Sequence, residues 1–529
     1  MKSIYDAVIL GAGHNGLVAA AYLARAGLSV LLLEKNDYIG GASTSQQVFP
    51  DYDARLSRYA YLVSLFPEKI IRDLGLKIEL RARATGSFTP CAKDDGTHDG
   101  LLMSNVSEER SRRSMRELTG SDREFGQMQK FYGLARAFGE KVWDTMLEPL
   151  VAKEDFRSRF AVDDLHREAW RSLVEEPLGC VVERYLQNDL VRGLAFTDAK
   201  IGVCTHPHDE SLLQNRCFLY HHIGNKTGEW NVPVGGMGRV AAELERAARQ
   251  SGAQMLTRVE VRSLDVAGPR RSVEFSVDGK EHTVEARFLL VNFGANVLAK
   301  ILGRPHQPAA ADEGSVFKIN MLLRRLPRLK AARHSAADAF CGTFHSHEGY
   351  EQMKASQRAA SQGRLPDPLP CEIYCHTLTD DSILSPELRA QGFQTMTLFG
   401  LDTPWALFAR ENEAMRARAE KKFVESVNTW LAEPLEDCLA VARDGRPCLE
   451  SKSPVDLEEA LGLYHGNIFQ NALTFPFAEQ REQAGTWGVE TEFANVFMCG
   501  SSAQRGGAVS GIPGHNAARH VLEVVAGKR

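Results

Sequence analysis

Residues 8–16 read Val8-Ile9-Leu10-Gly11-Ala12-Gly13-His14-Asn15-Gly16 and contain the pattern Gly-x-Gly-x-x-Gly. The apolar residues 5–10 before it predict a buried strand, residues 14–25 predict a helix that Gly27 ends, and residues 29–33 predict a second strand. Glycines in this order allow a tight turn, a close approach to a pyrophosphate and close helix packing, with the positive helix end facing the phosphates. The stretch therefore predicts a Rossmann-type dinucleotide site, with a plain glycine-rich turn as the alternative.

The next residues favour FAD over a nicotinamide cofactor. Glu34 ends the second strand, where a carboxylate can accept hydrogen bonds from an adenosine ribose, and this argues against the 2′-phosphate of NADP. The neighbouring cation Lys35 softens that argument. The pair Gly40-Gly41 allows the chain to double back beneath the same pyrophosphate, as a tightly held FAD requires; an ordinary two-glycine turn is the alternative.

Two distant segments repeat strand and glycine patterns. The glycine-rich residues 234–238 precede a predicted helix, a strand over 255–261, a hairpin of residues 273–277 and 282–285 turning at Asp278-Gly279, and a buried strand over 288–291. Near the C-terminus, residues 495–499 predict a strand, and Pro513 suits the first turn of a helix. The positive end of that helix would stabilise a reduced, anionic flavin.

Taken together, these segments resemble the FAD-dependent phytoene desaturase or carotenoid oxidoreductase family, in particular its phytoene-dehydrogenase-related branch. Matching motifs run along most of the chain and occupy residues 11–17, 34–35, 40–42, 57–58, 61–62, 87–90, 234–238, 453–458, 465–469 and 511–518. The resemblance implies non-covalent FAD and a second domain that holds a long apolar substrate. The final loop departs from the family pattern, which commonly has histidine-proline before a glycine triplet. In that family Gln504 and Arg505 would lie near the flavin, and a polar, charged pair there argues against a pure hydrocarbon such as phytoene.

The glycine loop and the resemblance together give the expected cofactor contacts. They are Gly11, Gly13, His14, Asn15, Gly16, Glu34, Lys35, Gly40, Gly41, Ala42, Arg58, Val259, Gly500, Ser501, Gly511, Ile512 and Asn516.

The expected fold class is α/β, with a discontinuous Rossmann-type FAD-binding domain and a mixed α+β substrate domain, as in flavin amine oxidases and phytoene desaturases. We expect residues 1–85, 225–300 and 480–529 to form the first domain, and 86–224 and 301–479 the second. The first insert reads as mainly helical. The second combines strands over 317–323 and 395–401 with a helix over 413–431.

Composition narrows the class of protein. The 529 residues, 43% hydrophobic and 25% charged, are typical of a globular protein. A net charge of −5 without a long basic block argues against nucleic acid as a partner. The ten cysteines contain no C-x-x-C pair, which favours a reducing cytoplasm. Residues 125–150 carry an apolar helical face that predicts core packing, with peripheral membrane contact as the alternative; an oligomeric state stays open.

Histidines supply the candidates for catalysis. Cys204, His206 and His208 with Asp209, His345 and His347 with Glu348, and Cys371, Cys375 and His376 lack a recognised zinc spacing, so no metal is expected. His221 and His222 follow strand-like residues 218–220, and the resembling branch has a histidine pair there. One of the two would face the substrate as a general base or orient it, while a hydrogen-bonded core histidine is the alternative. Arg505 would anchor a polar substrate group or stabilise reduced flavin.

These features predict an FAD-dependent oxidoreductase that desaturates or dehydrogenates a largely apolar, or partly polar, small molecule by hydride transfer to flavin N5. A flavin-dependent isomerase or saturase of the same fold is one alternative. A non-catalytic protein that keeps FAD as a structural element is another.

Overall fold

The glycine loop joins strand β1 (Ile4–Leu10) to helix α1 (His14–Arg25) in the computed structural model, which describes residues 2–528. All four residues of β2 (Val30–Leu33) are buried, and β2 pairs in parallel with β1. Gly11 bends the chain between β1 and α1 with φ of +100°, a backbone angle that glycine adopts without strain. The predicted strand, turn, helix and strand therefore form at the start of the chain.

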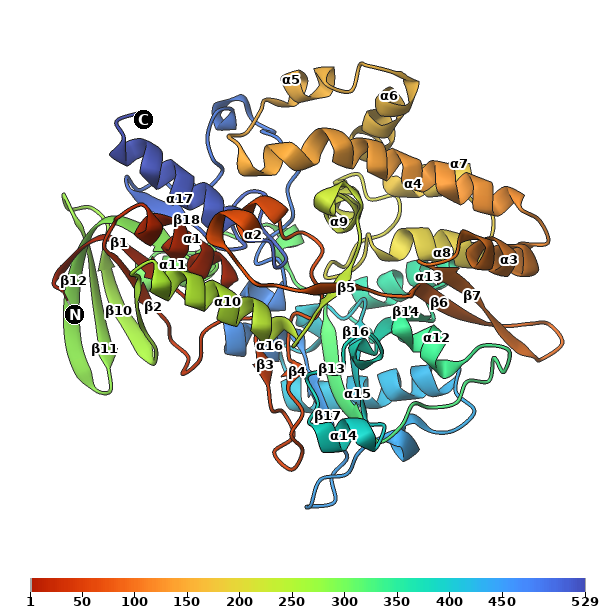
Figure 1. The fold of residues 1–529 in the computed structure, drawn as a ribbon. Coiled ribbons are helices and arrows are strands. Elements are labelled where there is room, and N and C mark those ends of the chain that lie inside the picture. Colours follow the sequence, from red (N-terminus) through yellow and green to blue (C-terminus); the bar gives the residue numbers. More distant parts are fainter. Residues whose placement is uncertain (1, 529) are drawn as a thin grey trace.

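Segments far apart in sequence complete the first sheet (Figure 1). The strand order is β10-β11-β12-β1-β2-β9, and β18 pairs in parallel with β12. The later strands of this sheet are β9 (Gln254–Leu256), β10 (Val259–Asp265), β11 (Arg271–Val277), β12 (Lys280–Val291) and β18 (Val496–Met498). Helices α10 (Met237–Gln250) and α17 (Ile512–Val525) pack against α1. One hydrophobic core joins these elements.

A second sheet lies beside the first, with helices on both sides of it (Figure 1). Its order is β17-β13-β16-β15-β14-β6-β7. The strands are β6 (Thr85–Ala92), β7 (His98–Ser104), β13 (Phe317–Leu323), β14 (Thr343–Ser346), β15 (Cys371–Tyr374), β16 (Gln394–Gly400) and β17 (Leu449–Lys452). Two short pairs, β3 (Ser45–Gln46) with β4 (Leu56–Ser57) and β5 (Leu80–Ala82) with β8 (Asn231–Pro233), lie outside both sheets.

The remaining helices come mostly from the two inserts. They are α2 (Glu68–Leu74), α3 (Glu108–Thr119), α4 (Arg123–Val142), α5 (Lys153–Ser158), α6 (Asp164–Trp170), α7 (Leu178–Tyr185), α8 (Asp189–Thr197), α9 (Leu213–His222), α11 (Ala295–Ile301), α12 (Ala336–Cys341), α13 (Tyr350–Ser361), α14 (Pro386–Ala390), α15 (Asn412–Asn428) and α16 (Pro454–Leu461). The apolar face of α4 is buried in a second core. Among residues 2–528, no helix combines the length and hydropathy needed to cross a bilayer.

Four local predictions differ from the structure. The predicted strands 282–285 and 288–291 form one continuous strand, β12. The predicted strand over 255–261 is interrupted at Arg258, whose φ of +56° turns the chain from β9 into β10. The mainly helical first insert also supplies β6 and β7 to the second sheet. Residues 218–220 belong to α9 and not to a strand, because tertiary packing decides between helix and strand for a short apolar run.

Candidate functional site

A cavity of about 850 Å³ reaches from the glycine loop to the second sheet. Its lining includes Gly11, Gly13, Glu34, Lys35 and Val259. It also includes aromatic residues, six of which we call the aromatic chamber: Tyr59, Tyr61, Tyr220, Trp230, Phe399 and Phe469. A cavity of this size, mostly apolar with a few polar groups, is typical of a cofactor or substrate site.

The glycine loop has the geometry that a pyrophosphate requires. A Cβ on Gly16 would lie 2.3 Å from the carbonyl oxygen of Gly11, so the turn accepts only glycine there. Among residues 2–528 no side chain caps the first turn of α1, which leaves its N–H groups available to an anion. Nε2 of His14 and Oδ1 of Asn15 are buried without a hydrogen-bond partner in the described chain. These residues fit a dinucleotide bound at the helix end.

Glu34 lies where an adenosine ribose is expected. Its two carboxylate oxygens accept hydrogen bonds from the N–H groups of Ala12 (2.7 Å) and Asn36 (2.9 Å), which fixes the side chain at the cavity wall. Burial raises the pKa of Glu34 above its ordinary value, partly offset by these hydrogen bonds. Each oxygen keeps a lone pair that can accept from a hydroxyl.

The Gly40-Gly41 turn passes directly against the loop, as the sequence suggested. The N–H of Gly40 donates to the carbonyl of Ala12 at 2.9 Å, and Gly40 forms a parallel bridge with Gly13. Gly41 adopts φ of +56°, and a Cβ there would lie 3.1 Å from the Cα of Gly13. Gly41 and the following Ala42 line the cavity.

The structure divides the remaining predicted cofactor residues into two groups. The cavity lining includes His14, Asn15, Lys35, Val259 and Ser501 as well as the residues above. Outside the lining are Gly16, Gly40, Arg58, Gly500, Gly511, Ile512 and Asn516. Several of these support the site from behind, since the amide of Asn516 donates to the carbonyl of Met146 and Gly500 packs on Asn292.

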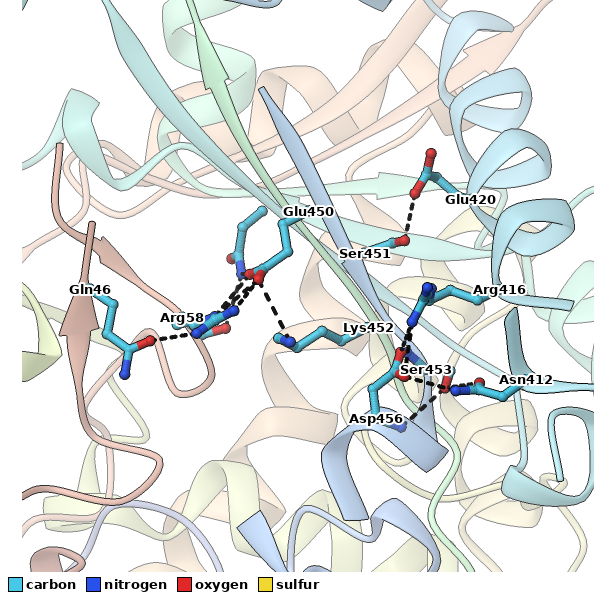
Figure 2. A network of polar contacts seen from close by, with 11 residues as sticks. Gln46, Arg58, Asn412, Arg416, Glu420, Glu450, Ser451, Lys452, Ser453 and Asp456 are labelled. Atoms are coloured by element: carbon cyan, nitrogen blue, oxygen red, sulfur yellow. Dashed lines mark hydrogen bonds and ion pairs between the residues drawn. The ribbon is translucent and has the colours of Figure 1, made fainter. Parts of the chain in front are cut away.

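Arg58 follows β4 and belongs to a polar network around Glu450 of β17 (Figure 2). Its Nε donates to both oxygens of Glu450 at 3.1 Å, and Nη1 donates to Gln46. The ion pair is part-buried and pins residues 46–58 to the second sheet. Arg58 therefore holds the segment that leads into the cavity-lining residues 59–62, with its guanidinium already occupied by Glu450.

His221 and His222 have different surroundings at the end of α9. His221 lines the cavity, and its Nδ1 donates to the carbonyl of Cys217 at 2.8 Å. This bond makes Nε2 the nitrogen with the free lone pair. Burial lowers the pKa of His221, although Asp198 opposes the shift, so the ring is neutral near pH 7. Nε2 of His222 instead contacts Asp198 at 2.8 Å.

Arg505 has a structural role in the loop before α17. Its guanidinium donates to the carbonyls of Thr145 (2.8 Å), Glu148 (2.7 Å) and Trp487 (3.1 Å). The side chain is buried and lies outside the cavity lining. The expected contact with substrate or flavin is therefore replaced by three bonds that hold loops together.

Among the cavity residues that sequence reasoning missed, two donate hydrogen bonds to backbone carbonyls of neighbouring segments. Asn292 follows β12 at the same sheet edge as the loop, and its Nδ2 donates to the carbonyls of Gly11 (3.0 Å) and Gly13 (3.3 Å). Its position directly after the predicted strand 288–291 was the available signal. Lys318 on β13 is buried in an apolar strand; its Nζ donates to the carbonyls of Ser57 and Tyr59, and burial lowers its pKa to about 7.

Of the three histidine groups weighed for metal binding, one brings ligand atoms together. In the described part of the chain, His345, Glu348 and Glu372 offer atoms within 4.8 Å of one another, and all three side chains are buried. His208 instead pairs with Glu183 at 3.0 Å.

The chain is similar in sequence and in fold to several known proteins. Residues 9–69 match the NAD(P)-binding Rossmann-like domain family. The uncharacterized protein Rv0897c of Mycobacterium tuberculosis is 44% identical over 99% of this chain and 98% of its own length. One of the subunits of limonene dehydrogenase from Castellaniella defragrans is 32% identical, over 62% of this chain and 61% of its own. A structure of putrescine oxidase bound to putrescine covers 99% of each chain with a TM-score of 0.56 at 15% identity, which confirms the α/β fold class.

Proposed function

We propose that this chain, which belongs to the same family as Rv0897c of Mycobacterium tuberculosis, is an FAD-dependent dehydrogenase of a largely apolar small molecule. The observation that carries the proposal is the shared cavity. It joins a pyrophosphate loop and a ribose-binding carboxylate to the aromatic chamber that also contains His221. The similarity to a limonene dehydrogenase supports oxidation of an apolar substrate.

FAD, when bound, supplies the hydride acceptor. The residues of the chain have three tasks around it. The glycine loop and α1 hold the pyrophosphate, Glu34 holds the ribose, and the aromatic chamber excludes water from the reacting carbon. Nε2 of His221 takes the proton that leaves the substrate with the hydride, because its lone pair is free and the ring is neutral.

Lys318 adds a second polar group to the chamber. In its protonated form Lys318 uses two of its three N–H groups for the carbonyls of Ser57 and Tyr59, which leaves one for a ligand oxygen or an ordered water. Its pKa of about 7 allows it to change charge near neutral pH. A largely apolar substrate with one oxygen acceptor suits this chamber best.

The test is anaerobic reduction of the FAD-loaded protein by candidate substrates: monoterpenoids with one oxygen and cyclic ketones, with the hydrocarbon limonene for comparison. Loss of the oxidised flavin absorbance together with formation of a product two hydrogens poorer supports the proposal. An isomer formed without net flavin reduction would make the protein an isomerase. Bound flavin that no ligand and no chemical reductant reduces would point to a structural role for FAD.

A further inference from the structure

Asn292 lies at the edge of the first sheet, where three segments that are remote in sequence meet. Its backbone N–H donates to the carbonyl of Leu10 at 2.8 Å, directly beyond the last parallel pair of β1 and β12, Leu10 with Val291. The N–H of Cys499 donates to the carbonyl of Val291 at 2.8 Å, and the next residue, Gly500, packs on Asn292. The backbone of Asn292 is therefore fixed by the sheet, and its side chain starts from a defined point beside the glycine loop.

The glycines around Asn292 leave space for its side chain. A Cβ on Gly13 would lie 3.1 Å from Nδ2 of Asn292, and a Cβ on Gly16 would lie 2.7 Å from the same atom. On the C-terminal segment, a Cβ on Gly500 would lie 3.0 Å from the carbonyl carbon of Asn292 and 3.2 Å from its Oδ1. Gly16 and Gly500 are outside the cavity lining, so packing on Asn292 gives a reason for glycine at both positions.

The Asn292 amide and the Glu34 carboxylate hold the same peptide group. Nδ2 carries two hydrogens and donates to the carbonyls of Gly11 at 3.0 Å and Gly13 at 3.3 Å. The carbonyl of Gly11 and the N–H of Ala12 belong to one planar, trans peptide, so they point in opposite directions. That N–H donates to Oε2 of Glu34 at 2.7 Å. The peptide is thus held at its carbonyl by Asn292 and at its N–H by Glu34.

We propose that Asn292 is a positioning residue for the adenosine diphosphate part of FAD. By fixing the Gly11–Ala12 peptide, its amide orients the Glu34 carboxylate toward the ribose and keeps the glycine loop in the shape that receives the pyrophosphate. Without the amide, the peptide can turn and set the carbonyl oxygen of Gly11 against the carboxylate of Glu34, which repels it. The inference rests on the proposed FAD site and deepens it.

The test uses ADP and 2′-deoxy-ADP, which share the pyrophosphate and differ by one ribose hydroxyl. Calorimetric titration of the stripped protein gives both dissociation constants. We expect the wild type to bind ADP about tenfold more tightly than 2′-deoxy-ADP, because Glu34 accepts a hydrogen bond from the 2′-hydroxyl. Asn292→Leu keeps nearly the same side-chain shape without a donor. It should raise the dissociation constant for ADP about tenfold or more and reduce the preference for ADP to less than about threefold.

Asn105→Leu is the matched control. Asn105 follows β7, and its Nδ2 also donates to a backbone carbonyl at 3.0 Å, that of Arg83. Asn105 is outside the cavity lining, so Asn105→Leu should keep the wild-type affinity for ADP and the wild-type preference over 2′-deoxy-ADP. Melting curves show that each variant is folded, and Asn292→Ala supplies the same comparison if Asn292→Leu is not.

The preference between the two nucleotides is a property that general loosening of the fold does not change selectively. Weaker ADP binding with a reduced preference in Asn292→Leu, and neither change in Asn105→Leu, supports the proposal. Wild-type affinity in Asn292→Leu, or weaker binding with the preference intact, would overturn it. A wild type that binds ADP without a preference would remove the ribose role of Glu34 and the proposal with it. If the wild type binds neither ADP nor FAD, the proposed FAD site itself fails, and this result is distinct from the others.

Discussion

His221 and His222 are adjacent in sequence, yet only His221 reaches the cavity. Along a helix, neighbouring side chains point about 100° apart, so one faces the chamber while the other faces Asp198. The sequence indicated that one histidine of the pair would be used, but it could not indicate which one. That choice depends on how α9 is rotated against the cavity, and the short apolar run 218–220 does not encode this.

Substitution of each histidine should separate the role of His221 from that of His222. His221→Ala should lower the rate of flavin reduction by a saturating substrate about 100-fold, because the proton acceptor is lost. His222→Gln keeps a donor for Asp198 and lies outside the cavity, so it should change the rate of flavin reduction by less than about threefold. Stopped-flow absorbance under anaerobic conditions measures both. Equal rates in the wild type and His221→Ala would exclude His221 as the base.

Arg505 gives a second prediction at this scale. Arg505→Met should lower the free energy of unfolding by about 3 kcal/mol, because three buried carbonyls lose a charged donor. Chemical denaturation measures the change, and FAD reduction by dithionite should proceed normally in the folded variant. Unchanged stability combined with loss of flavin reduction by substrate would instead indicate that Arg505 contacts the substrate.

At the scale of elements, the start of the chain could be predicted closely and the second sheet could not. The glycine spacing predicts β1, the loop, α1 and β2, because the turn and the strand–helix–strand order are set by neighbouring residues. Asp278 and Gly279 adopt the positive φ angles expected of the hairpin turn. By contrast, β6 joins β14 across more than 250 residues. No short pattern records such a pairing, so the strands of the first insert were missed.

The glycine loop gives a prediction about the affinity for FAD. Gly16→Ala would place a Cβ 2.3 Å from the carbonyl of Gly11 and 2.7 Å from the amide of Asn292, and should displace the loop. We expect the dissociation constant for FAD to rise at least about tenfold, or 1.4 kcal/mol. Gly126→Ala in α4 is the control, since nothing lies within 4 Å of its Cβ and alanine favours helix. Equal FAD affinity in both variants would contradict the loop assignment.

At the scale of the whole molecule, burial of neutral histidines links stability to pH. Burial lowers the pKa of His14 to about 4, of His376 to about 3 and of His515 to about 4. The unfolded chain therefore binds more protons than the folded one below pH 6.5, so the free energy of unfolding falls as pH falls. His345, Glu34 and Glu372, whose pKa values are raised, oppose this trend.

The apo-protein should therefore lose stability between pH 6.5 and pH 4. Each lowered histidine contributes about 1.4 kcal/mol per pH unit, so His14 alone costs on the order of 3 kcal/mol at pH 4. Denaturant titrations at several pH values measure the slope, and His376→Leu should make it shallower. A free energy of unfolding that stays level from pH 6.5 to pH 4 would contradict the neutral burial of these rings.

The proposed function requires that separate parts of the chain build one FAD site, and calorimetric titration of the stripped protein with FAD tests this most directly. We expect saturation at one FAD for each chain, with quenching of flavin fluorescence and no competition from NADP. A protein that melts cooperatively but takes up no flavin, or that binds NADP in its place, would contradict a shared FAD site.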